Sequence, residues 1–238
     1  MSRPSRSATG RAVSCARSSG EQRSAATGRP ALDIVDVGGG TGGLAVPFAA
    51  LGHNVIVVDP SPDALAAAHR RAAEAGARLT SVQGDAASLD SVAGPGAADL
   101  VICHNVLEYV EEPADAMNAI ARVLRPSATV SVLASNAVAA VLHRALAGRF
   151  AEARRLLTEP AAGTPRRFTL PELTALVEQA GLRAGEAHGL RIFGGLVPGS
   201  LLDGDAAATE ALRALEEAAA STPPLRDIAA QLHVLGHR

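Results

Sequence analysis

Short apolar runs alternate with amphipathic stretches along most of the chain. The apolar runs have the length of strands, and they cover residues 32–37, 54–58, 79–82, 98–103 and 129–134. The stretches between them have helical periodicity, and they cover residues 42–51, 61–74 and 114–124. This alternation predicts an α/β protein in which a mostly parallel sheet is covered by helices on both faces.

The second half of the chain has a less regular pattern. Helices are expected at 137–147 and 152–157, followed by a loop with arginines and prolines, and we interpret residues 137–168 as a helical insertion over a site. The run from Thr169 to Glu172 is a capping box that begins a further helix. Two last strands are expected at 182–187 and 231–237, after helices at 206–220 and 225–230. The predicted fold is Rossmann-like, with seven strands and an antiparallel last strand.

Residues 1–30 differ in kind from the rest. They hold six arginines, seven serines and one acidic residue, Glu21, without apolar periodicity. This composition predicts a disordered tail before a single folded domain over residues 31–238. A start of this kind also resembles an organellar transit peptide. Lysine is absent from the whole chain, however, and Ala and Arg abound throughout, which favours a bias of the coding sequence.

Composition narrows the classes of function. No apolar stretch approaches the length that crosses a bilayer, and Cys15 and Cys103 offer no disulfide framework, so we expect a cytoplasmic protein without a membrane segment. When the tail's six arginines and one glutamate are set aside, 16 basic and 23 acidic residues remain, and this balance does not indicate nucleic-acid binding. The seven histidines are scattered without ligand spacing, so no metal site is expected.

The strongest candidate site follows the first expected strand. Gly38, Gly40 and Gly43 satisfy the G-x-G-x-x-G spacing, which lets the backbone turn tightly and approach a ligand closely. Asp36 precedes them at the end of the strand. A carboxylate there would repel the pyrophosphate of NAD and attract a cation. S-adenosylmethionine carries an ammonium and a sulfonium and no phosphate, so the pattern favours this cofactor.

Two further acidic residues follow the next strands. Asp59 lies 21 residues after Gly38, where a carboxylate can accept both hydroxyl protons of a ribose, and the alternative role is that of a helix N-cap. Asp85 follows the third strand, where it can accept a hydrogen bond from an adenine amino group or be a solvated turn residue. Both positions predict contacts to a nucleoside.

His104 and Asn105 follow the fourth strand directly. Ligands in open α/β sheets sit beyond the carboxyl ends of the strands, so both residues are expected to face the cofactor and its methyl group. A packed structural histidine is the alternative, and if the acceptor is a hydroxyl or an amine, His104 is the best candidate base. Basic residues in and near the insertion either bind an anionic substrate, RNA included, or form a solvated helix face. They are His143, Arg144, Arg149, Arg154, Arg155, Arg166, Arg167 and Arg191.

These residues resemble class I S-adenosylmethionine-dependent methyltransferases. A closer resemblance, over residues 31–238, is to bacterial methyltransferases that esterify 5-carboxymethoxyuridine at the tRNA wobble position. The motifs that carry it are Asp-Val-Gly-Gly-Gly (36–40), His-Asn-Val-Leu-Glu-Tyr-Val (104–110), Ser-Asn-Ala (135–137), Ala-Gly-Arg-Phe (147–150), Gly-Leu-Arg-Ile-Phe (189–193) and Gln-Leu-His-Val-Leu (231–235). The sequence departs from that family at Ser135, where the tRNA enzymes carry a tyrosine, and residues 1–30 show no counterpart of the family's N-terminal helical segment.

The resemblance implies methyl transfer to an anionic acceptor, either a carboxylate on a modified tRNA uridine or a small molecule. The cofactor would be held by Asp36, Gly38, Gly39, Gly40, Asp59, Asp85 and His104. His104, Asn136 and Arg191 would serve the reaction, with Arg191 orienting the acceptor's negative charge. Three alternatives stay open: a small-molecule O- or N-methyltransferase, an NAD(P)-dependent oxidoreductase and a non-catalytic cofactor-binding protein.

Overall fold

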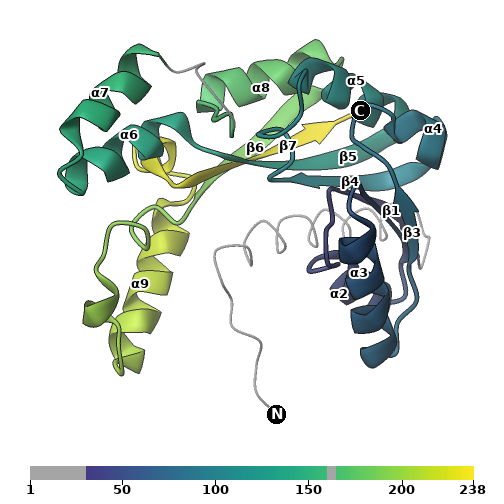
Figure 1. Cartoon of the computed structure of the whole chain (residues 1–238), viewed down its shortest axis with the longest axis horizontal. Helices are drawn as coiled ribbons and strands as arrows, with labels where there is room; N and C mark the ends of the chain where they lie inside the picture. The colour runs from purple at the N-terminus through teal and green to yellow at the C-terminus, as the bar shows by residue number, and fades with distance from the viewer. Residues whose placement is uncertain (1–30, 160–164) are drawn as a thin grey trace.

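A seven-stranded sheet forms the centre of the computed structural model, which describes residues 31–159 and 165–238 (Figure 1). The strand order is β3-β2-β1-β4-β5-β7-β6. The strands are β1 (Asp33–Val37), β2 (Asn54–Asp59), β3 (Thr80–Gln83), β4 (Ala98–His104), β5 (Leu124–Ser135), β6 (Arg183–Leu190) and β7 (Gln231–His237). The first five strands are parallel, whereas β7 runs antiparallel to both β5 and β6. The predicted Rossmann-like sheet is therefore confirmed. The predicted tail, residues 1–30, lies outside the described residues.

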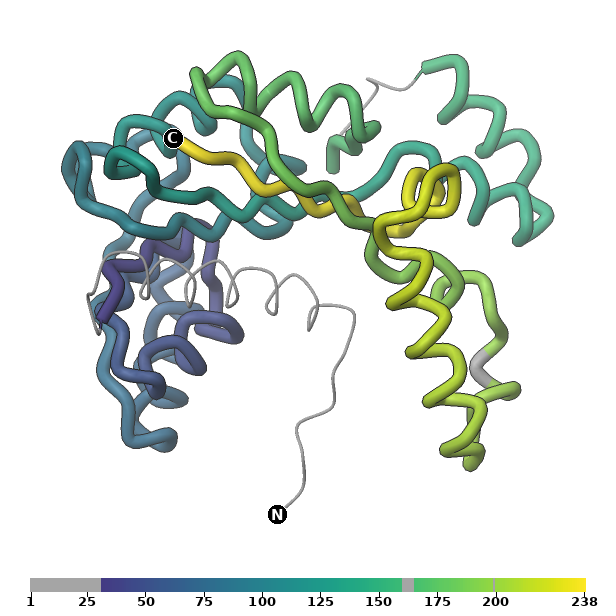
Figure 2. The backbone as a smooth tube through the Cα atoms, turned by 180° about the vertical axis from the view of Figure 1, so that it is seen from behind, coloured from purple at the N-terminus to yellow at the C-terminus, as the bar shows by residue number. Residues whose placement is uncertain are grey.

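Helices lie on both faces of the sheet. They are α2 (Ala45–Ala50), α3 (Pro62–Glu74), α4 (Leu89–Ala93), α5 (Pro113–Val123), α6 (Ala137–Leu146), α7 (Phe150–Thr158), α8 (Leu170–Gln179) and α9 (Ala206–Ala219), with short 3-10 turns η1 (Gly199–Leu201) and η2 (Arg226–Ile228). Figure 1 shows α5 and α8 on one face, and α2, α3 and α9 on the other. From behind, in Figure 2, α9 and the α2–α3 pair stand at opposite ends of their shared face.

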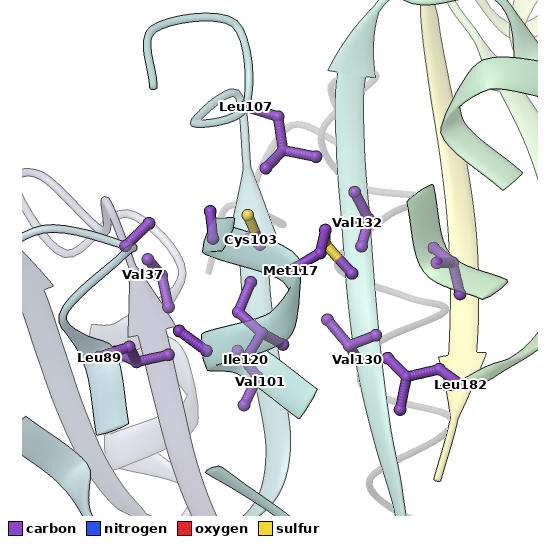
Figure 3. Close-up of a cluster of buried hydrophobic side chains, with 14 of the residues drawn as sticks. Val37, Leu89, Val101, Cys103, Leu107, Met117, Ile120, Val130, Val132 and Leu182 are labelled. Carbon is purple, nitrogen blue, oxygen red and sulfur yellow. The ribbon is translucent and has the colours of Figure 1, made fainter. Parts of the chain in front are cut away.

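The central strand β4 is buried from both sides. Val101 and Cys103 pack with Met117 and Ile120 of α5 in the cluster drawn in Figure 3. The alternate residues of β4, such as Ile102, belong to a second cluster on the opposite face. Because successive strand residues point to opposite faces, a strand covered on both sides reads as an unbroken apolar run, as residues 98–103 do. The carboxyl ends of the strands are left to carry the polar site residues.

The insertion region contains two helices, α6 and α7, between β5 and α8. Arg144 of α6 and Glu152 of α7 form an ion pair at 3.0 Å. Residues 160–164 of the expected loop lie outside the described residues. Thr169 and Glu172 form both hydrogen bonds of the predicted capping box at the start of α8.

Several local expectations were inaccurate, among them the end of β6, which lies at Leu190 and not at residue 187. Helix α4 was not predicted, because five residues are too few for a periodic pattern. Strand β5 begins at Leu124 and not at residue 129, with the left-handed residue Ser127 (φ 63°) inside it. Helix α2 begins at Ala45 and not at residue 42, because Gly42 (φ 76°) still belongs to the turn. The helix expected over residues 225–230 is the shorter 3-10 turn η2.

Candidate functional site

The glycine turn after β1 has a backbone that only glycine accommodates easily. Gly38, Gly40 and Gly42 have φ values of 63°, 54° and 76°. A Cβ on Gly38 would overlap the side chain of Val106, which follows β4. Glycine here therefore serves the turn itself and its close packing against the segment after β4.

Asp36 lies beneath this turn. Its side chain is only 2% exposed, and its Oδ2 has no hydrogen-bond partner among the described residues. A Cβ on Gly39 would stand 2.6 Å from that oxygen. Burial raises the pKa of Asp36 to about 7, a backbone hydrogen bond from Ala45 opposes this rise, and the charge of Asp59 adds to it. A neighbouring cation would favour the ionised carboxylate.

Asp59 joins the end of β2 to the glycine turn. Its Oδ2 accepts a hydrogen bond from the backbone N–H of Gly40 and its Oδ1 accepts one from Ser61, both at 2.9 Å. The N-cap of α3 is Ser61, whose hydroxyl accepts from the N–H of Ala64. Asp59 therefore does not cap the helix. Each of its oxygens keeps a lone pair that could accept a hydroxyl proton.

Asp85 lies in an exposed turn between β3 and α4. Its Oδ1 accepts hydrogen bonds from the backbone N–H and the hydroxyl of Ser88, at 2.8 and 2.7 Å. These bonds lower the pKa of Asp85, so it is ionised at neutral pH. This geometry is that of a turn residue, and it leaves the carboxylate just after the carboxyl end of β3.

The register of the parallel strands brings three of these groups to one edge of the sheet. Asp36 pairs with Val57 of β2 and with Ile102 of β4, so the ends of β1, β2 and β4 lie side by side. Asp59 and His104 are the last residues of β2 and β4. The glycine turn, Asp59 and His104 therefore share the carboxyl edge of the sheet, as the sequence predicted.

His104 is partly buried at this edge. Its Nε2 lies 2.8 Å from the hydroxyl of Ser131 on β5, whereas its Nδ1 has no partner among the described residues. Burial lowers the pKa of His104 to about 4, so the ring is neutral at pH 7. The neighbouring Asn105 has a left-handed backbone (φ 56°) and accepts a hydrogen bond from Gln231 at 2.7 Å. A neutral imidazole with one unpartnered nitrogen can take up a proton.

Asn136 has its side chain fully engaged within the protein. Its Nδ2 donates to the carbonyls of Asp227 and Ala229, at 2.9 and 2.7 Å, and its Oδ1 accepts from the N–H of Val138. It is the N-cap of α6 and only 2% exposed. With every polar group of the amide used, the geometry favours a structural role for Asn136 over the catalytic one expected from the sequence.

Arg191 follows β6 with a left-handed backbone (φ 58°) and an exposed side chain. The next three residues, Ile192, Phe193 and Gly194, donate their backbone N–H groups to the carboxylate of Glu216 on α9, at 2.8, 2.9 and 2.7 Å. Glu216 thereby anchors the turn that carries Arg191. The sequence did not predict this contact, because nothing in the pattern around Glu216 distinguishes it from the solvated glutamates that are common on helices.

Two further buried polar groups were also missed. Glu108 is 2% exposed, its Oε1 accepts from the N–H and the hydroxyl of Ser135, and its Oε2 has no partner among the described residues. His233 is fully buried and lies 2.8 Å from Ser131. The only signal in the sequence was an ionisable residue placed in an apolar run.

The described part of the chain contains neither a cluster of metal-ligating residues nor a membrane-spanning helix. No group of three or more His, Cys, Asp or Glu residues within 31–159 and 165–238 could hold a metal ion. Over the same ranges, no helix is both long and apolar enough to cross a membrane.

Comparison with known proteins places this fold and site in a class. The methyltransferase domain family matches residues 35–132. The chain is 33% identical over 166 residues to the ubiquinone biosynthesis O-methyltransferase of Burkholderia pseudomallei, a match that covers 68% of each chain. The protein belongs to the S-adenosylmethionine-dependent methyltransferases, the class that the glycine turn and Asp36 predicted.

A second curated relative matches over a shorter region. The chain is 34% identical over 121 residues to the tRNA 5-carboxymethoxyuridine methyltransferase of Escherichia coli K12. This match covers 50% of the chain and spans about half (46%) of that enzyme's length.

Solved structures show the same fold at low sequence identity. A S-adenosylmethionine-dependent methyltransferase from Mesorhizobium loti superposes with a TM-score of 0.57 at 21% identity, covering 87% of this chain and 91% of that one. The magnesium protoporphyrin IX methyltransferase of Synechocystis PCC 6803, solved with S-adenosylhomocysteine bound, gives 0.58 at 17% identity, covering 95% and 84%.

Proposed function

We propose that this protein transfers the methyl group of S-adenosylmethionine to an anionic acceptor. The observation that carries the proposal is the meeting of the glycine turn, Asp59 and His104 at one carboxyl edge of the sheet. The residues present fit the cofactor. Asp36 offers to a cationic ligand a buried carboxylate oxygen that has no hydrogen-bond partner among the described residues, and Asp59 offers two acceptor oxygens to a ribose.

Each residue has a defined task in this proposal. Asp59 binds the ribose hydroxyls while it holds the N–H of Gly40, and Asp85 accepts from the adenine amino group. Asp36 stabilises the cofactor's positive charge from beneath the glycine turn. The sulfonium is an activated methyl donor, so the protein contributes mainly proximity and orientation, which can lower a barrier by several kcal/mol, on the order of 7.

A conservative change at Asp59 tests the cofactor assignment. Asp59→Asn keeps the size of the side chain but removes one acceptor, and we expect S-adenosylhomocysteine to bind about 10-fold more weakly or worse. The matched control is Asp63→Asn, an exposed acidic residue in the first turn of α3. Equal affinity of wild type and Asp59→Asn in a calorimetric titration would refute the ribose assignment.

The acceptor that we propose is a carboxylate, on a modified tRNA uridine or on a small molecule. The exposed guanidinium of Arg191, on a turn anchored by Glu216, supports an acceptor with negative charge. The similarity to the Escherichia coli tRNA enzyme over half of its length points to the tRNA version. Methylation of an ionised carboxylate needs no general base.

A second acceptor class is favoured by His104. Its ring is neutral and its Nδ1 is unpartnered among the described residues, which suits removal of a proton from a hydroxyl. The relative from Burkholderia pseudomallei is named as an O-methyltransferase.

One experiment separates the two acceptor classes. Labelled S-adenosylmethionine is incubated with the protein and either total tRNA or a small-molecule extract from the same cells. Label in tRNA that mild alkali releases supports an esterified carboxylate. Alkali-stable label confined to the extract would end the tRNA proposal, and label in neither fraction, beside an active reference enzyme, would contradict methyl transfer itself.

A further inference from the structure

A row of histidines crosses the sheet behind the site. His104 of β4 is in register with Leu133 of β5, Leu133 with His233 of β7, and His233 with His188 of β6. Ser131 lies two residues before Leu133 and so points to the same face. Its neighbours Val130 and Val132 belong to the apolar core on the opposite face.

Ser131 connects two of these rings. Its hydroxyl oxygen lies 2.8 Å from Nε2 of His104 and 2.8 Å from Nε2 of His233. Ser131 and His233 are both fully buried. The Nδ1 atoms of the two histidines have no hydrogen-bond partner among the described residues. Buried polar atoms without partners are uncommon in folded proteins, and two at the ends of one hydrogen-bonded chain call for an explanation.

A serine hydroxyl has one hydrogen, and this fact couples the two rings. The hydroxyl can donate to only one Nε2, and when it does so it can only accept from the other. Both histidines are neutral, since burial lowers the pKa of each. If His104 donates from Nε2, its Nδ1 is bare and His233 carries its hydrogen on Nδ1. If His233 donates, the tautomers are reversed, and His104 can no longer take up a proton at Nδ1.

We propose that Ser131 and His233 are positioning residues that hold His104 in the tautomer with a bare Nδ1, poised to accept a proton from a hydroxyl acceptor. This inference rests on the proposed function, in the case where the methyl acceptor is a hydroxyl group. His104 is the last residue of β4, at the carboxyl edge, and the residue is partly exposed although its Nδ1 atom is buried, whereas His233 is fully buried. Only the first arrangement therefore leaves a bare Nδ1 on the ring that lies next to the site.

The proton and electrons balance in this scheme. The acceptor oxygen bonds to the methyl carbon while the carbon–sulfur bond breaks, and its electron pair stays on sulfur. The hydroxyl proton passes to Nδ1 of His104, so the positive charge that leaves sulfur reappears on the imidazole. The Nε2 proton of His104 can then pass to Ser131 as the serine proton passes to His233.

Two other histidine rings lie next to His233, which would accept the proton in the last step. His188 of β6 stacks on His233 with ring centroids 5.8 Å apart, and His104 approaches it edge-on at 5.9 Å. A carboxylate oxygen of Glu186 lies 3.7 Å from Nε2 of His188. The row therefore leads away from the cofactor edge toward the outer strand β6.

Nitrogen NMR of the histidine rings tests the inference directly. Protein labelled with ¹⁵N-histidine is measured alone and with S-adenosylhomocysteine, and the His104 signals are assigned by their absence in His104→Gln. We expect the single Nε2–H tautomer for His104 and the Nδ1–H tautomer for His233. Ser131→Ala should convert His104 to a tautomer mixture, and Ser131→Thr, which keeps the hydroxyl, should restore the single form.

The chain supplies a matched control on the same two strands. Thr129 of β5 lies 3.2 Å from Nδ1 of His237 of β7, so Thr129→Val removes a similar hydroxyl–histidine pair away from His104. It should leave the His104 signals unchanged. An Nδ1–H tautomer of His104 in the wild type, or unchanged His104 signals in Ser131→Ala, would overturn the inference. Failure to bind S-adenosylhomocysteine would instead sink the proposed function, because the tautomers are read in the free protein as well.

Discussion

The two halves of the sheet build their parts of the site in different ways. Around β1, β2 and β4, the site consists of residues at strand ends and a glycine turn. The backbone N–H of Gly40 donates to the carboxylate of Asp59, and that of Gly38 donates to the carbonyl of Val58, so the turn is joined to the end of β2. Around β5, β6 and β7, side chains distant in sequence hold it together, such as Asn136 with Ala229, 93 residues apart, and Ser131 with His233, 102 residues apart. Under the proposed function, cofactor binding would thus depend on local backbone geometry, and acceptor binding on long-range contacts.

The largest effect on the free energy of unfolding is expected when a glycine of the turn after β1 is replaced by alanine. Gly38→Ala forces a left-handed residue and an overlap with Val106. We expect a loss of about 3 kcal/mol of unfolding free energy, together with loss of S-adenosylhomocysteine binding. Gly43→Ala is the matched control, because a Cβ there meets no atom within 4 Å. The measurement is urea unfolding of both variants. Equal stability of Gly38→Ala and Gly43→Ala would contradict the view that the backbone geometry of the turn holds this part of the site together.

On the other half of the sheet, Asn136→Ala tests the long-range contacts. The change removes the cap of α6 and leaves two carbonyls, of Asp227 and Ala229, without their donor. The expected loss is about 2–3 kcal/mol in thermal or urea unfolding. Asp205→Ala, which removes only the exposed cap of α9, should cost about 1 kcal/mol. A larger cost for Asp205→Ala would show that the contacts of Asn136 contribute little.

A smaller and more selective effect is expected at the turn that carries Arg191. Glu216→Gln weakens three backbone hydrogen bonds to residues 192–194, and we expect about 1–2 kcal/mol of destabilisation. The KM for the acceptor should rise, whereas the affinity for S-adenosylhomocysteine should stay within about twofold. Glu217→Gln is the control, since Glu217 is on the same helix and pairs with Arg213. If Glu216→Gln weakened the binding of S-adenosylhomocysteine as much as it raised the KM for the acceptor, the distinction between the two halves of the sheet would not hold.

The pH dependence of binding gives the most specific effect, because a single ionisable group causes it. Burial raises the pKa of Asp36 to about 7, so this carboxyl group stays protonated to a higher pH in the folded protein than in the unfolded chain. Its contribution to stability is therefore present at low pH and is lost as the pH rises through about 7. Binding of a cationic ligand should follow the opposite trend and weaken below pH 7, by up to about tenfold per pH unit. Asp36→Asn should flatten this profile in titrations from pH 5 to 8, and an unchanged slope would exclude Asp36 as its cause.

The same division explains what could be predicted from the sequence. Gly38, Asp59 and His104 follow apolar runs directly, so a local pattern places them at strand ends and hence at one edge of a parallel sheet. No local pattern pairs Ser131 with His233 or Glu216 with Ile192, because those contacts depend on the order β5-β7-β6 and on the packing of α9. Asn136 illustrates this limit: its sequence neighbours match a family motif, whereas the hydrogen bonds of its amide to distant carbonyls could not be foreseen, and its catalytic role stays a prediction.

The central claim is that the carboxyl edge of β1, β2 and β4 is a site for S-adenosylmethionine. Calorimetric titration of the full chain with S-adenosylhomocysteine, beside NADH, tests it most directly. The account predicts saturable binding of one S-adenosylhomocysteine per chain, weakened by Asp59→Asn, and no heat from NADH. A folded sample that binds NADH, or that binds S-adenosylhomocysteine equally well with Asp59→Asn, would contradict it.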